Sequence, residues 1–384
     1  MKVALVHELL TMKGGAERVM RIFAQMFPDA PIYTLLYDEK KLGDWFPKER
    51  VRVSSAQPHF PFSMFHFSLN HHLHLKKFPA AVEAWPFGSA QGDTPQYDLV
   101  LSSSSAFVHG IITNSAPRHV CYVQSPARYL WDRTHDVQAR AGKGFFGRAR
   151  RWYLSRLFHR LRVWDCETSD RPDTLIAASK EVQRRIELYW RHESNVIYPP
   201  IDDGWFADGE VVGTPGRVDP TPYYLIVSQL VDYKRIDLAI RACNERKVSL
   251  IIAGEGSARR SLEAIAGPSV QFVGYKTDEE LRELYVGAKA TIFAGEEDFG
   301  LVPLESLACG TPVVAFRGGG ALETLTPETA EFFDEPTAQS LGEALGKATT
   351  RTWDAAACRA QAKNFSRSRF EEQMRAAISA TLAA

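Results

Sequence analysis

Short apolar segments recur along the chain, and each is followed by a polar or glycine-bearing turn and then by a segment with helical periodicity. The clearest apolar segments are Lys2–Val6, Pro31–Leu36, Tyr97–Leu101, Val120–Val123, Asp173–Ala178, Tyr224–Ser228, Ser249–Ala253, Val270–Val273, Ala290–Phe293 and Val313–Phe316. Uninterrupted apolar runs of this length are typical of strands buried on both faces of a parallel sheet. Strands that alternate with helices predict an α/β fold built from Rossmann-like units.

The length of the chain predicts more than one domain. It has 384 residues, of which 45% are hydrophobic, enough for two cores. Pro199 and Pro200 precede a polar, glycine-bearing stretch at 202–220, which is typical of a domain boundary. We therefore predict a first domain over 1–198 and a second over 199–365, followed by an amphipathic helix near Arg369–Leu382.

The stretch from Phe293 to Phe316 reads as the end of a strand, an acidic loop, a short helix and a second strand. Gly300 is suited to the N-cap, and Pro303 falls in the first helical turn, where a missing N–H costs least. The start of such a helix presents unpaired N–H groups that favour a phosphate. Glu297 and Glu305 can then flank one bound ligand, although an ordinary acidic helix start with a solvated Glu297 is the alternative.

Glycine turns follow several of the predicted strands. Gly14 and Gly15 precede a helix predicted over 16–27, an arrangement that brings backbone close to a phosphate in Rossmann-like units; a plain tight turn is the alternative. Similar turns occur at Gly254 and at 318–320. The GxGxxG pattern at 142–147 follows no strand and is not interpreted as a dinucleotide fingerprint.

The segment Glu-Asp-Phe-Gly-Leu-Val-Pro-Leu-Glu at 297–305 resembles the paired-glutamate signature of retaining glycosyltransferases of family 4. The resemblance extends over about residues 1–335 and implies the GT-B fold, two Rossmann-like domains that face each other across a cleft. It also implies that the C-terminal helix, within 366–384, packs back on the first domain. Glu305 would hold the donor ribose, and Glu297 would lie near the donor sugar. The remaining donor-binding positions implied by the resemblance are Gly14, Gly15, Lys234, Arg235, Gly254, Tyr275, Phe299, Gly300 and Leu301.

A second segment, Gln124-Ser-Pro-Ala-Arg-Tyr-Leu-Trp131, resembles a bacterial mannosyltransferase-like branch of that family. Gln124 stands where the branch has a histidine that helps to hold the donor sugar, so we count Gln124, Glu297 and Lys234 as candidate catalytic residues. Gln124 can donate and accept hydrogen bonds but cannot carry a proton. Gln229 stands where many members have an arginine for the diphosphate, which leaves Lys234 and its neighbour Arg235 for that role.

Two segments predict surfaces for other partners. Residues 143–162 carry seven Lys and Arg and no acid, interleaved with aromatic and aliphatic residues, and residues 1–200 hold 27 Lys and Arg against 19 Asp and Glu. Such a segment favours an anionic lipid or lipid-diphosphate surface; a solvated helix face and a nucleic-acid site are alternatives, but no nucleic-acid motif accompanies it. Residues 59–87 interleave aromatic residues and histidines, and we predict a mobile, exposed aromatic surface there that faces acceptor or membrane, with a packed helical hairpin as the alternative.

The resemblance implies a metal-independent, retaining hexosyltransferase that needs no cofactor. We expect GDP-mannose as the donor and a free or polyprenyl-diphosphate-linked saccharide as the acceptor, in surface polysaccharide biosynthesis. The five scattered cysteines indicate a reducing compartment, and the basic segment a peripheral position at the cytoplasmic face of the inner membrane. A GT-B sugar-nucleotide epimerase and a binding-only relative stay open as alternatives.

Overall fold

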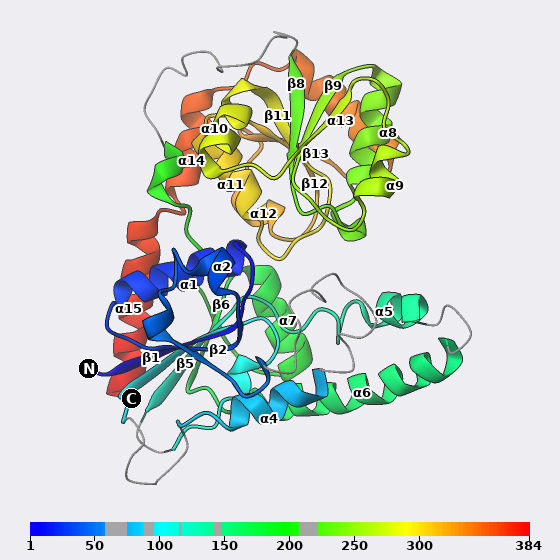
Figure 1. Cartoon of the computed structure of the whole chain (residues 1–384). Coiled ribbons are helices and arrows are strands. Elements are labelled where there is room, and N and C mark those ends of the chain that lie inside the picture. Colours follow the sequence, from blue (N-terminus) through cyan, green and yellow to red (C-terminus); the bar gives the residue numbers. More distant parts are fainter. Residues whose placement is uncertain (58–74, 88–95, 115–116, 142–146, 207–221) are drawn as a thin grey trace. The chain divides into compact units, whose positions relative to one another are not determined.

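A computed structural model describes residues 1–57, 75–87, 96–114, 117–141, 147–206 and 222–384 (Figure 1). The chain divides into two compact domains, Met1–Tyr198 with Glu371–Ala384, and Pro199–Phe370. Each is a parallel sheet flanked by helices, which confirms the predicted α/β fold of two Rossmann-like domains. Among the described residues, no helix is both long and apolar enough to cross a bilayer.

The first domain contains a seven-stranded sheet in the order β3-β2-β1-β4-β5-β6-β7. Its strands are β1 (Val3–Leu10), β2 (Ile32–Tyr37), β3 (Val51–Val53), β4 (Leu99–Ser104), β5 (Arg118–Val123), β6 (Thr174–Ala177) and β7 (Asn195–Val196). Its helices are α1 (Gly15–Met26), α2 (Glu39–Leu42), α4 (Phe78–Glu83), α5 (Thr134–Ala141), α6 (Gly147–Thr168), α7 (Lys180–Trp190) and most of α15 (Arg367–Ala383), with short 3-10 turns at Lys48–Arg50, Leu75–Lys77 and Val108–Gly110.

The second domain contains a six-stranded sheet in the order β10-β9-β8-β11-β12-β13. Its strands are β8 (Tyr223–Val227), β9 (Ser249–Ala253), β10 (Val270–Gly274), β11 (Ala288–Phe293), β12 (Val313–Phe316) and β13 (Ala330–Phe333). Its helices are α8 (Ile236–Arg246), α9 (Arg259–Glu263), α10 (Asp278–Gly287), α11 (Leu301–Ala308), α12 (Ala321–Thr324), α13 (Ala338–Thr350) and α14 (Ala355–Lys363), with 3-10 turns at Asp203–Phe206 and Asp232–Lys234.

The two sheets share one topology. In each sheet, the first three strands follow one another in one direction, and the fourth strand pairs with the first strand on its other side. The strand order therefore reverses between β1 and β4 and between β8 and β11. Ligands of open α/β sheets bind outside the carboxyl ends of the strands at this reversal. The loops at these two reversals are therefore the expected positions of ligand sites.

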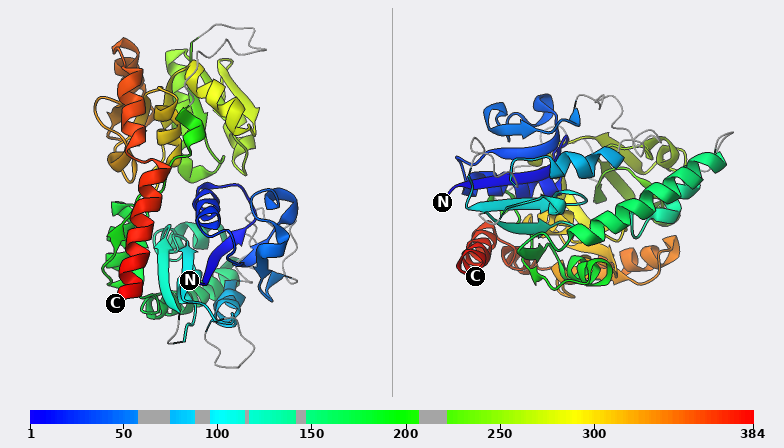
Figure 2. Two further views of the ribbon diagram at one scale, coloured as in Figure 1. Left: turned by 90° about the vertical axis from the view of Figure 1, so that its left-hand side faces the viewer. Right: turned by 90° about the horizontal axis from the view of Figure 1, so that it is seen from below.

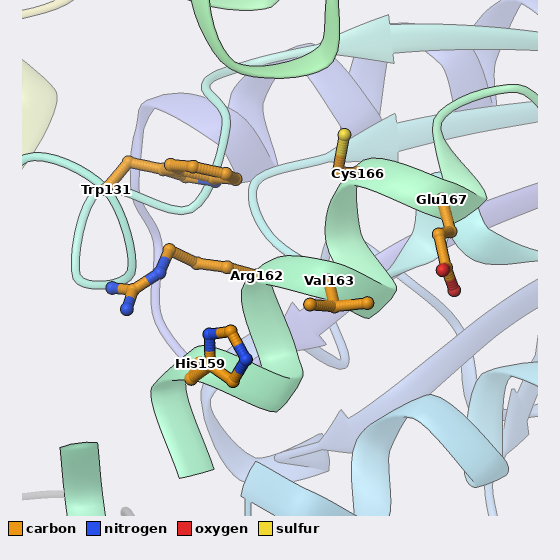
Figure 3. Close-up of a pocket in the computed structure, with 6 residues that line it drawn as sticks. All are labelled: Trp131, His159, Arg162, Val163, Cys166 and Glu167. Carbon is orange, nitrogen blue, oxygen red and sulfur yellow. The ribbon is translucent and has the colours of Figure 1, made fainter. Parts of the chain in front are cut away.

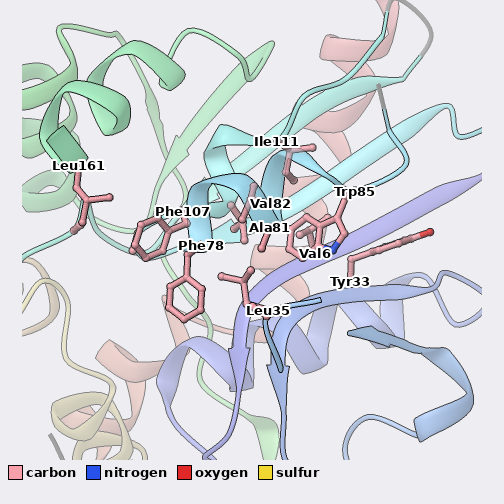
Figure 4. Packing of buried hydrophobic residues seen from close by; sticks show 14 of the residues in the cluster. Val6, Tyr33, Leu35, Phe78, Ala81, Val82, Trp85, Phe107, Ile111 and Leu161 are labelled. Carbon is pink, nitrogen blue, oxygen red and sulfur yellow. The ribbon is translucent and has the colours of Figure 1, made fainter. Parts of the chain in front are cut away.

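The first domain packs its helices on both faces of the sheet because residues alternate along each strand. Ala4 and Val6 of β1 face a cluster that includes Phe78, Val82 and Phe107 (Figure 4). Burial on both faces explains why its strands read as nearly continuous apolar runs.

The predicted aromatic surface at 59–87 is wrong where the structure describes it. Phe78, Trp85 and Phe87 are at most 8% exposed, and Phe87 and Trp85 pack edge-on against Tyr33 of β2. These rings cover one face of the sheet, which would otherwise leave apolar strands in water. The predictions for 58–74, including the histidines there, lie outside the described residues.

Strand β1 is longer than predicted and extends to Leu10 rather than ending at Val6. The two polar residues beyond Val6 are buried, His7 at 2% and Glu8 at 5% exposure. They remain in the strand because both have partners. His7 lies 3.7 Å from Glu17 of α1, and Glu8 accepts backbone hydrogen bonds described below.

Candidate active site

The second domain brings Lys234 and Glu297 together at the reversal of its sheet. Lys234 ends the 3-10 turn after β8, Glu297 lies in the loop after β11, and β8 and β11 are neighbouring strands. The Lys234 ammonium forms an ion pair with the Glu297 carboxylate, with the side chains 15% and 23% exposed. Sequence reasoning placed both residues near the donor but did not foresee this pair. A cation held by one carboxylate can exchange that partner for an incoming phosphate.

Glycines allow the loops around this pair to approach each other closely. A Cβ at Gly295 would lie 2.9 Å from the Cα of Lys234. Gly319 has φ +56°, and a Cβ there would lie 2.3 Å from the carbonyl oxygen of Glu297, which accepts a hydrogen bond from Gly320. The glycine loop at 318–320 therefore holds the backbone of Glu297 in place, a reason for its glycines that the sequence did not supply.

Helix α11 begins beside the same pair. Gly300 is its N-cap with φ +86°, a conformation that favours glycine. Glu305, one turn into the helix, is 7% exposed and accepts a 3.0 Å hydrogen bond from the hydroxyl of Tyr285 on α10. Tyr285 thus fixes the orientation of the carboxylate, which can accept further hydrogen bonds from a ligand.

The other predicted donor-binding residues of the second domain differ in accessibility. Tyr275, after β10, is 67% exposed, and Leu301, at the first position of α11, is half-buried. Gly254 has φ +130°, and a Cβ there would clash with the carbonyl oxygen of Ser228. Phe299 is 6% exposed against Phe365, so its side chain serves the core and only its backbone can meet a ligand.

Arg235 does not share a helix with Lys234. It adopts a left-handed conformation between the 3-10 turn and α8, and its guanidinium lies 3.3 Å from Asp237. Gln229, which takes the place of the expected arginine, is exposed in the loop after β8. Lys234 is therefore the cation that pairs with Glu297.

The candidates of the first domain also lie beyond the carboxyl ends of strands. Gly14 is the N-cap of α1, and its N–H donates to the Glu17 carboxylate at 3.1 Å; Gly15 is the exposed first residue of that helix. Gln124 follows β5, and its side-chain amide donates to the Ser103 hydroxyl at 3.2 Å. The structure does not join these residues to Lys234 or Glu297 in one described site.

Glu8 is a functional-site candidate that the sequence analysis missed. It lies on β1 at the reversal of the first sheet, and its carboxylate accepts backbone hydrogen bonds from Ser105, Ala106, Phe107 and Val108 at 2.6–3.2 Å. Converging amides of this kind otherwise bind anions. Glu8 fills the cradle itself, so the first domain offers no anion site there. The one sequence feature that could have pointed to Glu8 was an acidic residue in an otherwise apolar strand.

A second buried carboxylate supports the loop that carries Gln124. Asp165 of α6 is 1% exposed and accepts hydrogen bonds from the indole N–H groups of Trp131 and Trp190 at 2.8 and 2.7 Å. Burial raises the pKa of Asp165 to about 7, and the two indole bonds oppose that rise. Its neighbour His109 is fully buried, and burial lowers the pKa of its imidazole to about 3. His109 is therefore neutral near pH 7.

Solved structures share this architecture. The chain superposes on HepE from Anabaena bound to UDP-glucose with a TM-score of 0.70 over 99% of this chain and 100% of that one, at 17% identity. It superposes on sucrose-phosphate synthase from Thermosynechococcus elongatus with a TM-score of 0.71 over 99% of both chains, again at 17% identity. The protein has the GT-B fold.

The matches by sequence each cover part of the chain. Residues 214–365 match the family model described as Glycosyl transferases group 1. A GDP-mannose-dependent alpha-mannosyltransferase from Mycobacterium tuberculosis is 33% identical over 122 residues, 32% of each chain. D-inositol 3-phosphate glycosyltransferase from Acidothermus cellulolyticus is 33% identical over 165 residues, 36% of this chain and 37% of its own. The matches thus span about a third of the length of these relatives.

The glycosyl transferases group 1 match includes Lys234, Glu297 and Glu305. This match supports the general expectation that the protein is a glycosyltransferase. The retaining mechanism, the mannosyltransferase-like branch, the donor and the acceptor stay predictions.

Proposed function

We propose that the protein transfers a hexose from a nucleoside diphosphate sugar to a saccharide acceptor and retains the α-configuration. The observation that carries the proposal is the grouping of Lys234, Glu297, Glu305 and the start of α11 at the reversal of the second sheet. The relatives described as GDP-mannose-dependent favour GDP-mannose as the donor. A polyprenyl-diphosphate-linked saccharide for surface polysaccharide is the acceptor that we favour.

In this proposal the second domain binds the donor and stabilises its leaving group. The ribose hydroxyls donate to Glu305, whose orientation Tyr285 holds. The diphosphate lies at the start of α11, and Lys234 turns from Glu297 toward it. As the glycosidic bond breaks, negative charge grows on the diphosphate, and the helix N–H groups and the Lys234 ammonium stabilise that charge. Glu297, released from Lys234, orients the sugar by accepting hydrogen bonds from its hydroxyl groups.

The acceptor hydroxyl then attacks the anomeric carbon from the face that the diphosphate leaves, as the resemblance to retaining enzymes implies, with no protein nucleophile and no metal. Its proton passes to the departing diphosphate oxygen as the new C–O bond replaces the one that breaks. Gln124, from the first domain, would contribute one hydrogen bond to the sugar in place of the histidine of the related branch. An amide cannot stabilise growing positive charge by changing its protonation, so we expect slow transfer compared with enzymes that carry histidine there.

The test is a panel of GDP-, UDP-, dTDP- and ADP-sugars in which thermal stabilisation and nucleoside diphosphate release are both followed. We expect stabilisation by one donor class, and release of its diphosphate once acceptor is added. Stabilisation without release, even with lipid-linked acceptors, would favour the epimerase or the binding-only alternative. A chain that responds to no donor would contradict the proposal.

A further inference from the structure

The first domain has a cavity that is widely open to solvent, with a volume of about 320 Å³, between the loop after β5 and the exposed side of α6 (Figure 3). The volume is at the lower end of the range of ligand pockets, about 300–1,000 Å³. The lining residues are Trp131, His159, Arg162, Val163, Cys166 and Glu167. The five from α6 fall at 159, 162–163 and 166–167, three or four residues from one helical turn to the next, so they form one stripe along the helix.

Trp131 is held rigidly at the edge of this cavity. Its indole stacks on the ring of Tyr189, with centroids 4.7 Å apart and planes 9° apart. Its N–H donates to the buried carboxylate of Asp165 at 2.8 Å. A ring fixed by a stack and by a hydrogen bond loses little entropy when a ligand packs against it.

The polar groups around the cavity are mixed in sign. Arg162 and His159 can donate hydrogen bonds, and Glu167 can accept them. Arg162 already donates through one nitrogen to the Leu130 carbonyl at 2.9 Å, so only part of its donor capacity remains. One partly engaged guanidinium beside a carboxylate is a poor site for a diphosphate, which needs several cations and repels Glu167.

A pyranose ring fits this combination better. It offers C–H groups to an aromatic ring and to the Val163 side chain, and hydroxyl groups to donors and acceptors at the rim. Pockets that bind such ligands are largely apolar with a few polar groups that fix orientation. Both parts are present here.

We propose that this cavity is a saccharide subsite that binds a pyranose ring of the acceptor, with Trp131 as its aromatic platform. The inference rests on the proposed function for the identity of the ligand as acceptor. Trp131 lies seven positions after Gln124 in one loop, a span of at most about 25 Å. The cavity therefore lies within about 25 Å of Gln124, close enough for one oligosaccharide to reach both.

The test uses the full chain labelled with 5-fluorotryptophan, which gives one fluorine signal for each of its eight tryptophans. Trp131→Phe and Trp205→Phe identify two of them. The Trp131 signal reports the cavity. The Trp205 signal reports the donor site, because Trp205 lies edge-on to Tyr285, with ring centroids 5.7 Å apart, and Tyr285 holds Glu305. The probes are α-linked mannotriose, GDP, and vesicles of phosphatidylglycerol.

Two variants at matched positions separate the cavity from the rest of the surface. Val163→Phe fills the cavity from a residue that is 44% exposed, and Leu188→Phe makes the same kind of change on α7 at 42% exposure, outside the cavity. We expect mannotriose to shift the Trp131 signal in the parent and in Leu188→Phe. In Val163→Phe the apparent affinity should fall about tenfold or more.

The outcomes separate the subsite from the proposed function. A Trp205 shift with GDP but no Trp131 shift with mannotriose would overturn the subsite and leave the transferase proposal standing. A Trp131 shift with mannotriose in a chain whose Trp205 ignores nucleotides would support a saccharide site and count against the transferase. Equal affinity in Val163→Phe, or a Trp131 shift with vesicles and none with mannotriose, would also overturn the subsite.

Discussion

At the scale of single residues, the ion pair between Lys234 and Glu297 is the feature with the clearest functional consequence. Both side chains are half-buried, and each neutralises the other while no ligand is bound. A donor must compete for the lysine, and the released carboxylate becomes available to the sugar. One contact thus links diphosphate binding to sugar orientation.

We predict different effects for the two sides of this site. Glu305→Ala should weaken nucleotide binding about tenfold or more, because it removes a buried acceptor and leaves the Tyr285 hydroxyl without that bond. Lys234→Ala should chiefly lower kcat, by about 100-fold, because charge on the diphosphate grows in the transition state. Calorimetry with GDP and initial rates distinguish them. Glu245→Ala and Lys289→Ala, at exposed positions, are the controls, and unchanged values in both site variants would refute our placement of the site.

We also predict a pH dependence that belongs to Asp165. The pKa of Asp165 is about 7 in the folded chain, whereas the ordinary pKa of an aspartate is 3.8. Between these two pH values the folded state therefore keeps a proton that the unfolded state loses. Stability from this residue is therefore full below about pH 4 and falls as pH rises to about 7, by on the order of 2–4 kcal/mol.

Asp165→Asn isolates that contribution. The parent should lose stability relative to the variant between about pH 4 and 7, and the difference should be constant above. The neutral, buried His109 has the opposite dependence, because its pKa is lowered, but it is present in both chains and cancels. Thermal unfolding of both chains from pH 5 to 8 measures the difference, and parallel curves would show that Asp165 is ionised throughout.

At the scale of elements, Glu8 determines the conformation of the loop between β4 and the 3-10 turn that follows it. Four backbone N–H groups and the Ser104 hydroxyl converge on its two oxygens. The carboxylate does here what a bound anion does at the reversal of other α/β sheets. The backbone amides that could bind an anion are therefore occupied by a side chain of the same domain.

Glu8→Gln should loosen that loop. The amide nitrogen of glutamine cannot accept, so at least one N–H loses its partner, at a cost of about 1–3 kcal/mol. Hydrogen exchange of the amides of 105–108 should accelerate, whereas Glu187→Gln, an exposed change on α7, should not affect them. Unaltered protection in Glu8→Gln would mean that the cradle does not depend on the charge.

Helix α6 divides into two functional parts along its length. Its C-terminal half lines the cavity described above, whereas Arg148, Arg150 and Arg151 are exposed in its first turns, close to Trp152, which is 61% exposed. Its other side packs Leu154, Leu157, Phe158 and Leu161 into the core. From Gly147 on, the basic segment predicted from the sequence is thus part of a helix with one buried face.

We expect the basic half to bind an anionic membrane surface. Each arginine near such a surface contributes about 1 kcal/mol, so replacing Arg148, Arg150 and Arg151 with Ser should abolish most binding to phosphatidylglycerol vesicles. Flotation at low and high salt measures this, and binding by the parent should weaken with salt. Replacing Arg241, Arg260 and Lys289 of the second domain with Ser is the control. A parent chain that does not float with vesicles would rule out the membrane role.

At the scale of the whole molecule, the chain passes through both domains and then returns. After the second domain, Glu371–Ala384 of α15 belong to the first domain (Figure 2). Met374 and Ile378 are buried, and the Thr381 hydroxyl lies 2.8 Å from that of Thr174 on β6. The first domain is therefore completed only when the C-terminal helix is in place.

Ile378→Ala should destabilise the first domain by about 2–4 kcal/mol, the usual cost of a cavity in a core. Hydrogen exchange followed in each domain separately should rise in β5 and β6 and stay unchanged in β8 and β11. Glu372→Ala, at an exposed position of the same helix, is the control. If the second domain loosened equally, α15 would have to serve both domains.

Much of this architecture could be predicted because it is encoded locally. Apolar runs with glycine turns and helical periodicity depend on residues a few positions apart, and they located ten of the thirteen described strands and the start of α11 at Gly300, but not β3, β7 or β13. The acids at 297 and 305 could be singled out because they flank that helix start. Local pattern thus determined the α/β class and the positions of the candidate site residues.

The tertiary structure alone decided what these residues contact. Glu8 meets amides nearly 100 residues away, Lys234 meets Glu297 across two loops, and Trp131 meets Asp165 and Tyr189 from two helices. It also buried the aromatic residues at 78–87 that the composition alone suggested were exposed. Such contacts follow from which strands become neighbours and how tightly their loops close, and a side chain's own sequence surroundings carry no record of a partner that the fold brings from so far along the chain.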